Sequence, residues 1–212
     1  MNVIIFDLDG TLIDSRQDLT RAVNLTRDSY GLPPLTVETV CGFIGNGAAK
    51  LLERSLKGTG VDVADAMPRM KKYYSANLAN ETRLYPGVAE GLKKLAAGGM
   101  KMAVITNKPD EAAKLVLEKL GVHTYFDEIM GGGCGHPLKP EPDALLYFAA
   151  KWNADLKESW MVGDHYTDLD AGARAGMRTC WMSYGFGDPK GFPYDLEAKS
   201  FAEFVEAVFI SG

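Results

Sequence analysis

The stretch MNVIIFDLDGTLIDS, residues 1–15, indicates the fold and raises the first chemical question. Residues 2–6 have the apolar character of a buried strand, and they run directly into Asp7 and Asp9, which one leucine separates. Two carboxylates so close together repel each other and are costly to remove from water, so they need a counter-charge. A bound cation is the simplest counter-charge that this placement predicts.

Further apolar runs alternate with helical patterns along the chain. They cover residues 100–105, 160–162 and 179–182, and a weaker strand pattern, PYDLEA at 193–198, precedes a predicted helix over 200–209. The segment KMAVITNKPDEAAKLVLEKLGV, 101–122, contains an apolar strand, a polar turn with Pro109, and an amphipathic helix that stops at Gly121. Strands that alternate with helices predict an α/β fold with a parallel sheet flanked by helices.

Residues 16–80 have a different texture, with helical periodicity and almost no strand-like run. Apolar residues recur at three- and four-residue spacings in 16–31, 36–56 and 63–80, and glycine and proline residues break the pattern between these segments. We therefore expect a small all-helical domain over 16–80, inserted after the first strand. Residues 1–15 and 81–212 would form the α/β core domain.

Composition excludes several classes of function. Hydrophobic residues make up 46% of the chain and charged residues 24%, which is typical of a packed globular protein. A net charge of -5 argues against nucleic-acid binding. No signal peptide and no membrane-length apolar run is found, so a cytoplasmic protein is expected. Three widely separated cysteines, Cys41, Cys134 and Cys180, suggest neither a disulfide framework nor a zinc site.

Polar side chains follow the predicted strands where their carboxyl ends should meet at one edge of the sheet. Asp7 and Asp9 are two residues apart in an extended segment, so both carboxylates can face one point. Thr106 and Asn107 follow the strand at 100–105 and open a helix, whose free N–H groups favour an anion. Each pair alone also fits a chance acidic loop or a helix cap, and their joint position favours a site.

Asp164 and Asp168 follow the strand at 160–162. If a helix has begun by residue 164, the two carboxylates share one of its faces. Oxygen ligands without neighbouring histidine or cysteine clusters favour Mg²⁺ over zinc. Lys139 stands in an extended segment between prolines, and its ammonium is what a site rich in carboxylates and phosphate would need.

Four motifs in order carry a resemblance to a known family. DLDGTL at 7–12, VITNKP at 104–109, LKPEP at 138–142 and GDHYTD at 163–168 resemble the haloacid dehalogenase superfamily of aspartate-nucleophile phosphohydrolases. The resemblance implies a Rossmann-like core over residues 1 to 185, and it identifies 16–80 with the position of the cap domain in one subgroup. The segment GFIGNGAAKLLERSL, 42–56, is similar to the cap of phosphoglycolate phosphatases and their close relatives.

The resemblance also implies roles for the core residues. Asp7 would be the nucleophile that forms an aspartyl-phosphate, and Asp9 the general acid and then the general base. Thr106 and Lys139 would hold the phosphoryl oxygens. The implied cofactor is Mg²⁺, bound by Asp7, by the backbone carbonyl of Asp9, and by Asp164 with Asp168 in support.

Substrate contacts are implied for Asn107 and for two cap residues, Asn46 and Lys50, although exposure on a helix surface is an equal alternative for Lys50. The expected function is Mg²⁺-dependent hydrolysis of a small phosphorylated metabolite, 2-phosphoglycolate first, by a monomer or homodimer without nucleic-acid or membrane partners. Pyrophosphatase, nucleotidase and sugar-phosphate phosphatase activities stay open as alternatives.

More distant alternatives are a phosphomutase, a dehalogenase and a non-catalytic binding protein. The stretch DSRQDLTRAVN, 14–24, lacks the hinge histidine of related mutases. Asp9, which the dehalogenases lack, is present. A non-catalytic binding protein would be expected to lack at least one of Asp7, Asp9, Lys139 and Asp164, and all four are present. A phosphonate hydrolase using Lys50 has little support from the surrounding cap sequence.

Overall fold

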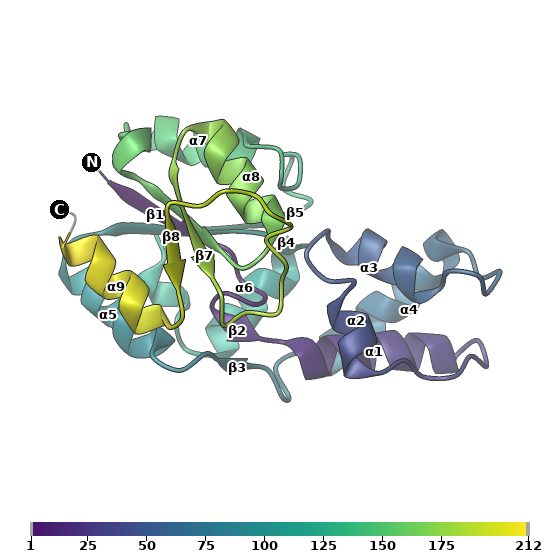
Figure 1. The fold of residues 1–212 in the computed structure, drawn as a ribbon. Coiled ribbons are helices and arrows are strands. Elements are labelled where there is room, and N and C mark those ends of the chain that lie inside the picture. The colour runs from purple at the N-terminus through teal and green to yellow at the C-terminus, as the bar shows by residue number, and fades with distance from the viewer. Residues whose placement is uncertain (1, 211–212) are drawn as a thin grey trace.

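A parallel sheet with a helical lobe beside it makes up the computed structural model, which describes residues 2–210 (Figure 1). Within these residues the main sheet has the strand order β5-β4-β1-β6-β7-β8, and all of its strand pairs are parallel. The strands are β1 (Val3–Phe6), β4 (Lys101–Pro109), β5 (Glu128–Gly132), β6 (Trp160–Gly163), β7 (Arg178–Met182) and β8 (Leu196–Ala198). Because β1 lies between β4 and β6, the residues that follow these three strands are neighbours.

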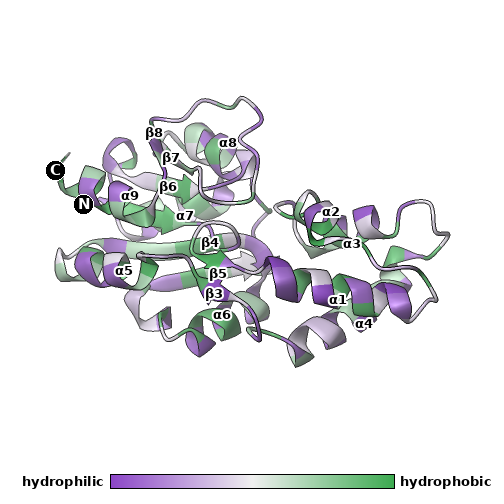
Figure 2. Cartoon of the chain, turned by 60° about the horizontal axis from the view of Figure 1, so that its bottom comes forward, coloured by the Kyte–Doolittle hydropathy of each residue, from purple (hydrophilic) through white to green (hydrophobic). Residues whose placement is uncertain are grey.

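Helices cover both faces of the sheet, which explains why β1 is apolar at every position. Ile4 and Phe6 pack in the cluster that includes α5 (Val88–Ala97), α6 (Asp110–Lys119) and α9 (Phe201–Ile210). Val3 and Ile5 point to the other face, against α7 (Asp143–Lys151) and α8 (Tyr166–Ala175). Hydrophobic colour accordingly runs along the central strands in Figure 2, while the flanking helices carry mixed bands. Short 3-10 turns, η1 (His123–Tyr125) and η2 (Leu156–Glu158), lead into β5 and β6.

The helical lobe lies between two short strands that lead into and out of it. β2 (Ile13–Asp14) and β3 (Arg83–Leu84) pair antiparallel, so the two connections run side by side. Between them are α1 (Arg16–Asp28), α2 (Val37–Cys41), α3 (Ala48–Ser55) and α4 (Val63–Ala76). We call this lobe, residues 16–80, the cap. It stands at the edge of the sheet where the strands β1 and β4 end (Figure 1).

The α/β architecture is as the sequence predicts, but several elements differ. Residues 36–56 form two helices, because the glycine-rich segment 42–47 interrupts them and Gly45 and Gly47 adopt φ values of +106° and +86°. The strand predicted over 100–105 continues to Pro109 as β4. β5 has no counterpart among the predicted strands, because its glycine-containing sequence EIMGG lies at a half-buried edge. The weak pattern at 193–198 contains β8.

None of the helices within 2–210 combines the length and the hydropathy needed to cross a bilayer.

Candidate active site

The loop after β1 places Asp7 at the end of the strand. The backbone N–H of Asp7 donates to Val162 O of β6 at 2.8 Å, and Asp7 is 8% exposed. The chain then turns sharply, with the N–H groups of Thr11 and Leu12 donating back to Leu8 O. This turn returns the chain beside Asp7 and brings Asp9 to the same edge of the sheet.

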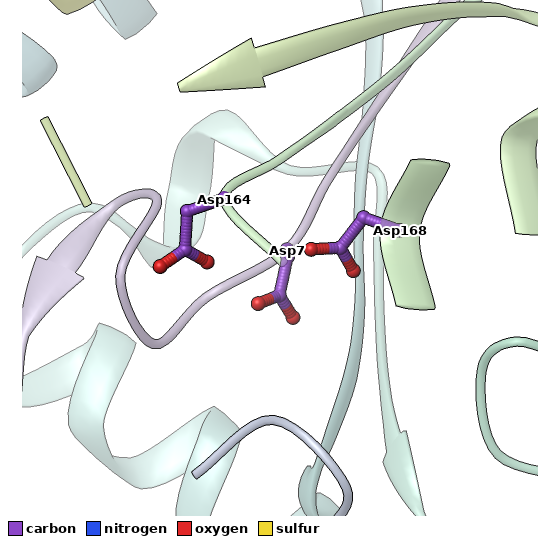
Figure 3. Close-up of side chains that lie close together, drawn as sticks. All are labelled: Asp7, Asp164 and Asp168. Carbon is purple, nitrogen blue, oxygen red and sulfur yellow. The ribbon is translucent and has the colours of Figure 1, made fainter. Parts of the chain in front are cut away.

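Three carboxylates converge at this edge. Asp7, Asp164 and Asp168 each present an oxygen, and these oxygens all lie within 4.8 Å of one another. Figure 3 shows Asp7 between the other two, with the carboxylates turned toward a common region. Asp164 and Asp168 are 1% exposed, so water compensates little of their mutual repulsion.

Backbone groups hold the two later aspartates in different ways. The N–H groups of Phe186 and Gly187 donate to Asp164 Oδ2 at 3.1 and 2.7 Å. Asp168 Oδ2 accepts from His165 N at 3.0 Å, as part of a capping box that starts α8. The prediction that both carboxylates share one helix face is wrong in its reason, because α8 begins at Tyr166 and Asp164 lies before it. They meet because a loop and a first helical turn follow one strand.

Lys139 supplies the positive charge that the sequence led us to expect. Its Nζ lies 2.8 Å from Asp7 Oδ1 and 2.8 Å from Asp168 Oδ1, and it donates to Ile105 O at 2.6 Å. The Asn107 side chain fixes the lysine backbone, since Oδ1 accepts from Lys139 N and Nδ2 donates to Lys139 O, both at 2.9 Å. The ammonium is therefore held between two of the three carboxylates.

The electrostatics of the cluster favour a further cation. Burial raises the pKa of Asp7 to about 6, with Lys139 opposing the shift and Asp168 adding to it. Burial, and then the charges of Asp168 and Asp7, hold the pKa of Asp164 well above its usual range. Burial would lower the pKa of Lys139, but the carboxylates of Asp168 and Asp7 raise it overall. Buried acids with an all-oxygen donor set fit a hard divalent cation such as Mg²⁺.

Asp9 has two partners that the sequence did not indicate. Lys108 Nζ donates to both of its oxygens, at 2.8 and 2.9 Å, and Ser15 Oγ donates to Asp9 Oδ1 at 2.5 Å. Lys108 directly follows Thr106 and Asn107 in the second motif, so its position offered a signal. The direction of its side chain depends on the extended course of β4 as far as Pro109.

Thr106 and Asn107 are adjacent in the site but make different hydrogen bonds. Both are nearly buried, at 4% and 7% exposure, and both line the cavity described below. Thr106 Oγ1 accepts from Lys108 N at 3.2 Å. Asn107 Nδ2 also donates to Gly45 O of the cap at 2.9 Å, so this amide connects the cap to the core.

A cavity of about 70 Å³ lies between the cap and the core. Core residues of the site, including Asp7, Asp9, Thr106, Lys108 and Lys139, line one side. The cap side is mostly apolar and is contributed chiefly by Leu19, Ile44, Leu51, Met67, Met70 and Tyr74. A phosphate ester bound in this cavity would have its phosphoryl group beside the carboxylates and its leaving group beneath the cap.

The two cap residues considered from the sequence do not line this cavity. Asn46 Nδ2 donates to Tyr166 Oη at 2.9 Å, and its Oδ1 accepts from Arg54 at 2.8 Å, so its amide joins the cap to α8. Lys50 lies on the exposed surface of α3, where its Nζ is 2.7 Å from Glu53 Oε2. Neither is brought to the cluster of carboxylates, because the face of α3 that packs inward carries Leu51 and Leu52.

Comparisons of this chain with a family model, with curated proteins and with solved structures agree on one family. A model of the haloacid dehalogenase-like hydrolases matches residues 4–182. Among curated proteins, phosphoglycolate phosphatases of Psychrobacter arcticus and Haemophilus influenzae are 37% and 38% identical, over 87% of this chain and 84% and 86% of their own lengths. A crystal structure of a predicted phosphoglycolate phosphatase from Haemophilus somnus superposes with a TM-score of 0.92 at 31% identity, covering 98% of this chain and 97% of the other.

Proposed function

This chain belongs to the haloacid dehalogenase-like hydrolase family and is a phosphoric monoester hydrolase, and from that premise we propose that it hydrolyses 2-phosphoglycolate through an aspartyl-phosphate at Asp7. The observation that carries the proposal is the meeting of Asp7, Asp164 and Asp168, with Lys139 paired to Asp7 and Asp168, beside a cavity between the cap and the core. The substrate is inferred from the names of the relatives.

Asp7 would act as the nucleophile. One of its oxygens forms a bond to phosphorus while the bond from phosphorus to the leaving oxygen breaks. Asp9 gives its proton to that oxygen, and the alcohol departs. A water molecule then attacks phosphorus and gives a proton to Asp9, while the bond between phosphorus and the Asp7 oxygen breaks. Phosphate is released, and Asp7 is again a free carboxylate.

The family's usual cofactor, Mg²⁺, fits the carboxylates of Asp7, Asp164 and Asp168, and when bound it would offset the repulsion between the nucleophile and an anionic phosphate. Lys139 and Thr106 would bind phosphoryl oxygens from the other side. The cap, residues 16–80, would exclude water from the reaction. Asn107 would keep the cap and Lys139 aligned, because its amide contacts both.

The alternatives differ in what the leaving group must be. Pyrophosphate, nucleotides and sugar phosphates stay possible within this family, and the mutase alternative stays disfavoured by the absence of a histidine in 14–24. The remaining parts of the proposal are a cytoplasmic location and a monomer or homodimer that acts on a small metabolite. The free thiols of Cys41, Cys134 and Cys180 are consistent with a reducing compartment.

The test is phosphate release from 2-phosphoglycolate, pyrophosphate, nucleoside monophosphates and sugar phosphates, with Mg²⁺ or EDTA. We expect kcat/KM on the order of 10⁴ M⁻¹s⁻¹ or more for the preferred substrate, and little turnover in EDTA. Asp7→Asn should lose activity by a factor on the order of 10³ or more, whereas Asp170→Asn, a half-buried aspartate of the same helix as Asp168, should not.

Acid quenching of a reaction with radiolabelled substrate should trap label on the wild-type protein and none on Asp7→Asn. Full activity of Asp7→Asn, or a panel without any turnover by folded, Mg²⁺-loaded protein, would contradict the proposal.

A further inference from the structure

One polar group in the cavity has no partner in ordinary hydrogen-bonding geometry among the described residues, although the Lys108 ammonium lies close enough to interact with it. Tyr74, in the last turn of α4, is 8% exposed, and within the described residues its Oη is buried without a hydrogen bond. A buried hydroxyl without a partner costs roughly 1–3 kcal/mol. Tyr74 lines the cavity beneath the cap, so a ligand in that cavity would lie against its side chain.

Lys108 lies beside this tyrosine. Its Nζ lies 4.9 Å from the centroid of the Tyr74 ring. Both hydrogen bonds of the ammonium go to one carboxylate, that of Asp9, although an ammonium has three donors. The side chain is 2% exposed, and its second polar neighbour is the Tyr74 hydroxyl, so the ammonium and the hydroxyl lie together beside the cavity.

The rest of the cap side of the cavity is apolar apart from Lys71. Leu19, Met67 and Met70 contribute side chains to this wall that offer no competing hydrogen bonds. The polar side chains toward the cap end of the cavity are thus Lys108, Tyr74 and the exposed Lys71, all hydrogen-bond donors and together suited to an anion.

We propose that Lys108 and Tyr74 form a subsite for a second acidic group of the substrate, which limits the preferred substrates to short phosphate esters that carry a carboxylate. This inference rests on the proposed function, because the phosphoryl group must occupy the Asp7 side of the cavity. The carboxylate accepts from Tyr74 Oη and from Lys108 Nζ. Lys108 then shares its charge between the substrate and Asp9, while the apolar wall excludes water from both.

A purely structural role makes a different prediction. If Tyr74 only fills space and Lys108 only pairs with Asp9, removing the tyrosine hydroxyl changes nothing that depends on the substrate's charge. Tyr74→Phe deletes that one atom and keeps the ring. Because Lys108 keeps both of its hydrogen bonds to Asp9 in this variant, the unfolding temperature should stay close to that of the wild type.

The experiment compares 2-phosphoglycolate with 2-hydroxyethyl phosphate, in which a neutral hydroxymethyl group replaces the carboxylate. We measure kcat/KM for both substrates with wild type, Tyr74→Phe, Lys108→Met and the control Tyr73→Phe, a half-buried neighbour in α4 that does not line the cavity. The wild type should prefer 2-phosphoglycolate by about 100-fold.

Tyr74→Phe should lower kcat/KM for 2-phosphoglycolate by about 10-fold or more and leave 2-hydroxyethyl phosphate within about 2-fold, mainly through KM. Lys108→Met should slow both substrates and also reduce the preference. Tyr73→Phe should match the wild type. Equal kcat/KM for the two substrates in the wild type, or an unchanged preference in Tyr74→Phe, would overturn the subsite.

A binding measurement separates this inference from the proposed function. Calorimetric titration of Mg²⁺-loaded Asp7→Asn with each compound should show tighter binding of 2-phosphoglycolate than of 2-hydroxyethyl phosphate. In the double variant Asp7→Asn, Tyr74→Phe, the ratio of the two Kd values should be smaller by about 10-fold. If the wild type hydrolyses neither compound but this difference is present, the hydrolytic proposal fails and the subsite stands. If hydrolysis occurs without the difference, the subsite fails.

Discussion

Gly10 lies where the loop after β1 passes Asp164, and it could not be another residue without a change in the site. Its φ is +93°, a left-handed value that side chains rarely adopt. A Cβ at this position would lie 1.9 Å from Asp164 Oδ2. The absence of a side chain at Gly10 therefore leaves room for the carboxylate of Asp164, which is 154 residues away in the sequence.

Gly10→Ala should displace the Asp164 carboxylate and weaken Mg²⁺ binding, with activity at saturating substrate lower by a factor on the order of 10². Titration of activity with Mg²⁺ measures this effect. Gly31→Ala is the matched control, since Gly31 has a φ of +69° but nothing within 4 Å of its Cβ position. Equal Mg²⁺ dependence in the two variants would show that backbone strain, and not the lost carboxylate position, explains the loss.

Helix α1 joins the two connections of the cap through one buried acid. Asp18 is 0% exposed and accepts hydrogen bonds from the backbone N–H groups of Glu81 and Thr82 and from Thr82 Oγ1, at 2.7–3.1 Å. The first turn of α1 is thereby attached to the chain that leaves the cap 63 residues later. This contact supplements the short β2–β3 pairing.

Asp18→Ala should lower the free energy of unfolding by about 2–4 kcal/mol, because it leaves several buried donors without an acceptor. Urea denaturation followed by circular dichroism measures the change. Asp28→Ala, at the exposed end of the same helix, should stay within about 0.5 kcal/mol of the wild type. A loss of similar size in both variants would argue that α1 itself, and not its contact with residues 81 and 82, is sensitive.

At the scale of the whole molecule, a few contacts set the cap against the core. Asn46 donates to Tyr166 Oη, Asn107 donates to Gly45 O, and a Cβ at Gly45 would lie 2.7 Å from the His165 ring. Burial lowers the pKa of His165 to about 4, so this ring is neutral at pH 7 and presents no charge to the cap. The described arrangement is one in which the cap is closed over the cavity.

Gly45→Ala should hinder this closure through the contact with His165, so kcat/KM should fall by about 10-fold or more, and the unfolding temperature should also fall because alanine is strained at a φ of +106°. Steady-state kinetics and thermal denaturation together measure both quantities. Gly58→Ala, a cap glycine with a φ of +78° and nothing within 4 Å of its Cβ position, is the control and should keep wild-type kinetics. Unchanged kinetics in Gly45→Ala would show that closure tolerates a side chain there.

Much of the fold and of the candidate site could be predicted because both depend on local sequence. The apolar run before Asp7 reads as a buried strand at every position, and strand–helix alternation requires a parallel sheet whose carboxyl ends share one edge. That geometry is enough to bring Asp7, Thr106 and Asp164 together without knowledge of any distance, whereas Lys139 is assigned to the site from its charge and from the family resemblance. β5 escaped prediction because an edge strand containing two glycines lacks the apolar pattern.

The sequence by itself determined the order of elements and which acids, lysine and hydroxyl gather at the edge of the sheet, since secondary structure and strand direction follow from neighbouring residues. The tertiary structure alone decided that Lys108 pairs with Asp9, 99 residues away, that Tyr74 faces the cavity, and that Asn46 and Lys50 do not. The physical reason is that a helix presents many side chains to its surroundings, and long-range packing of the cap on the core selects which of them face the site.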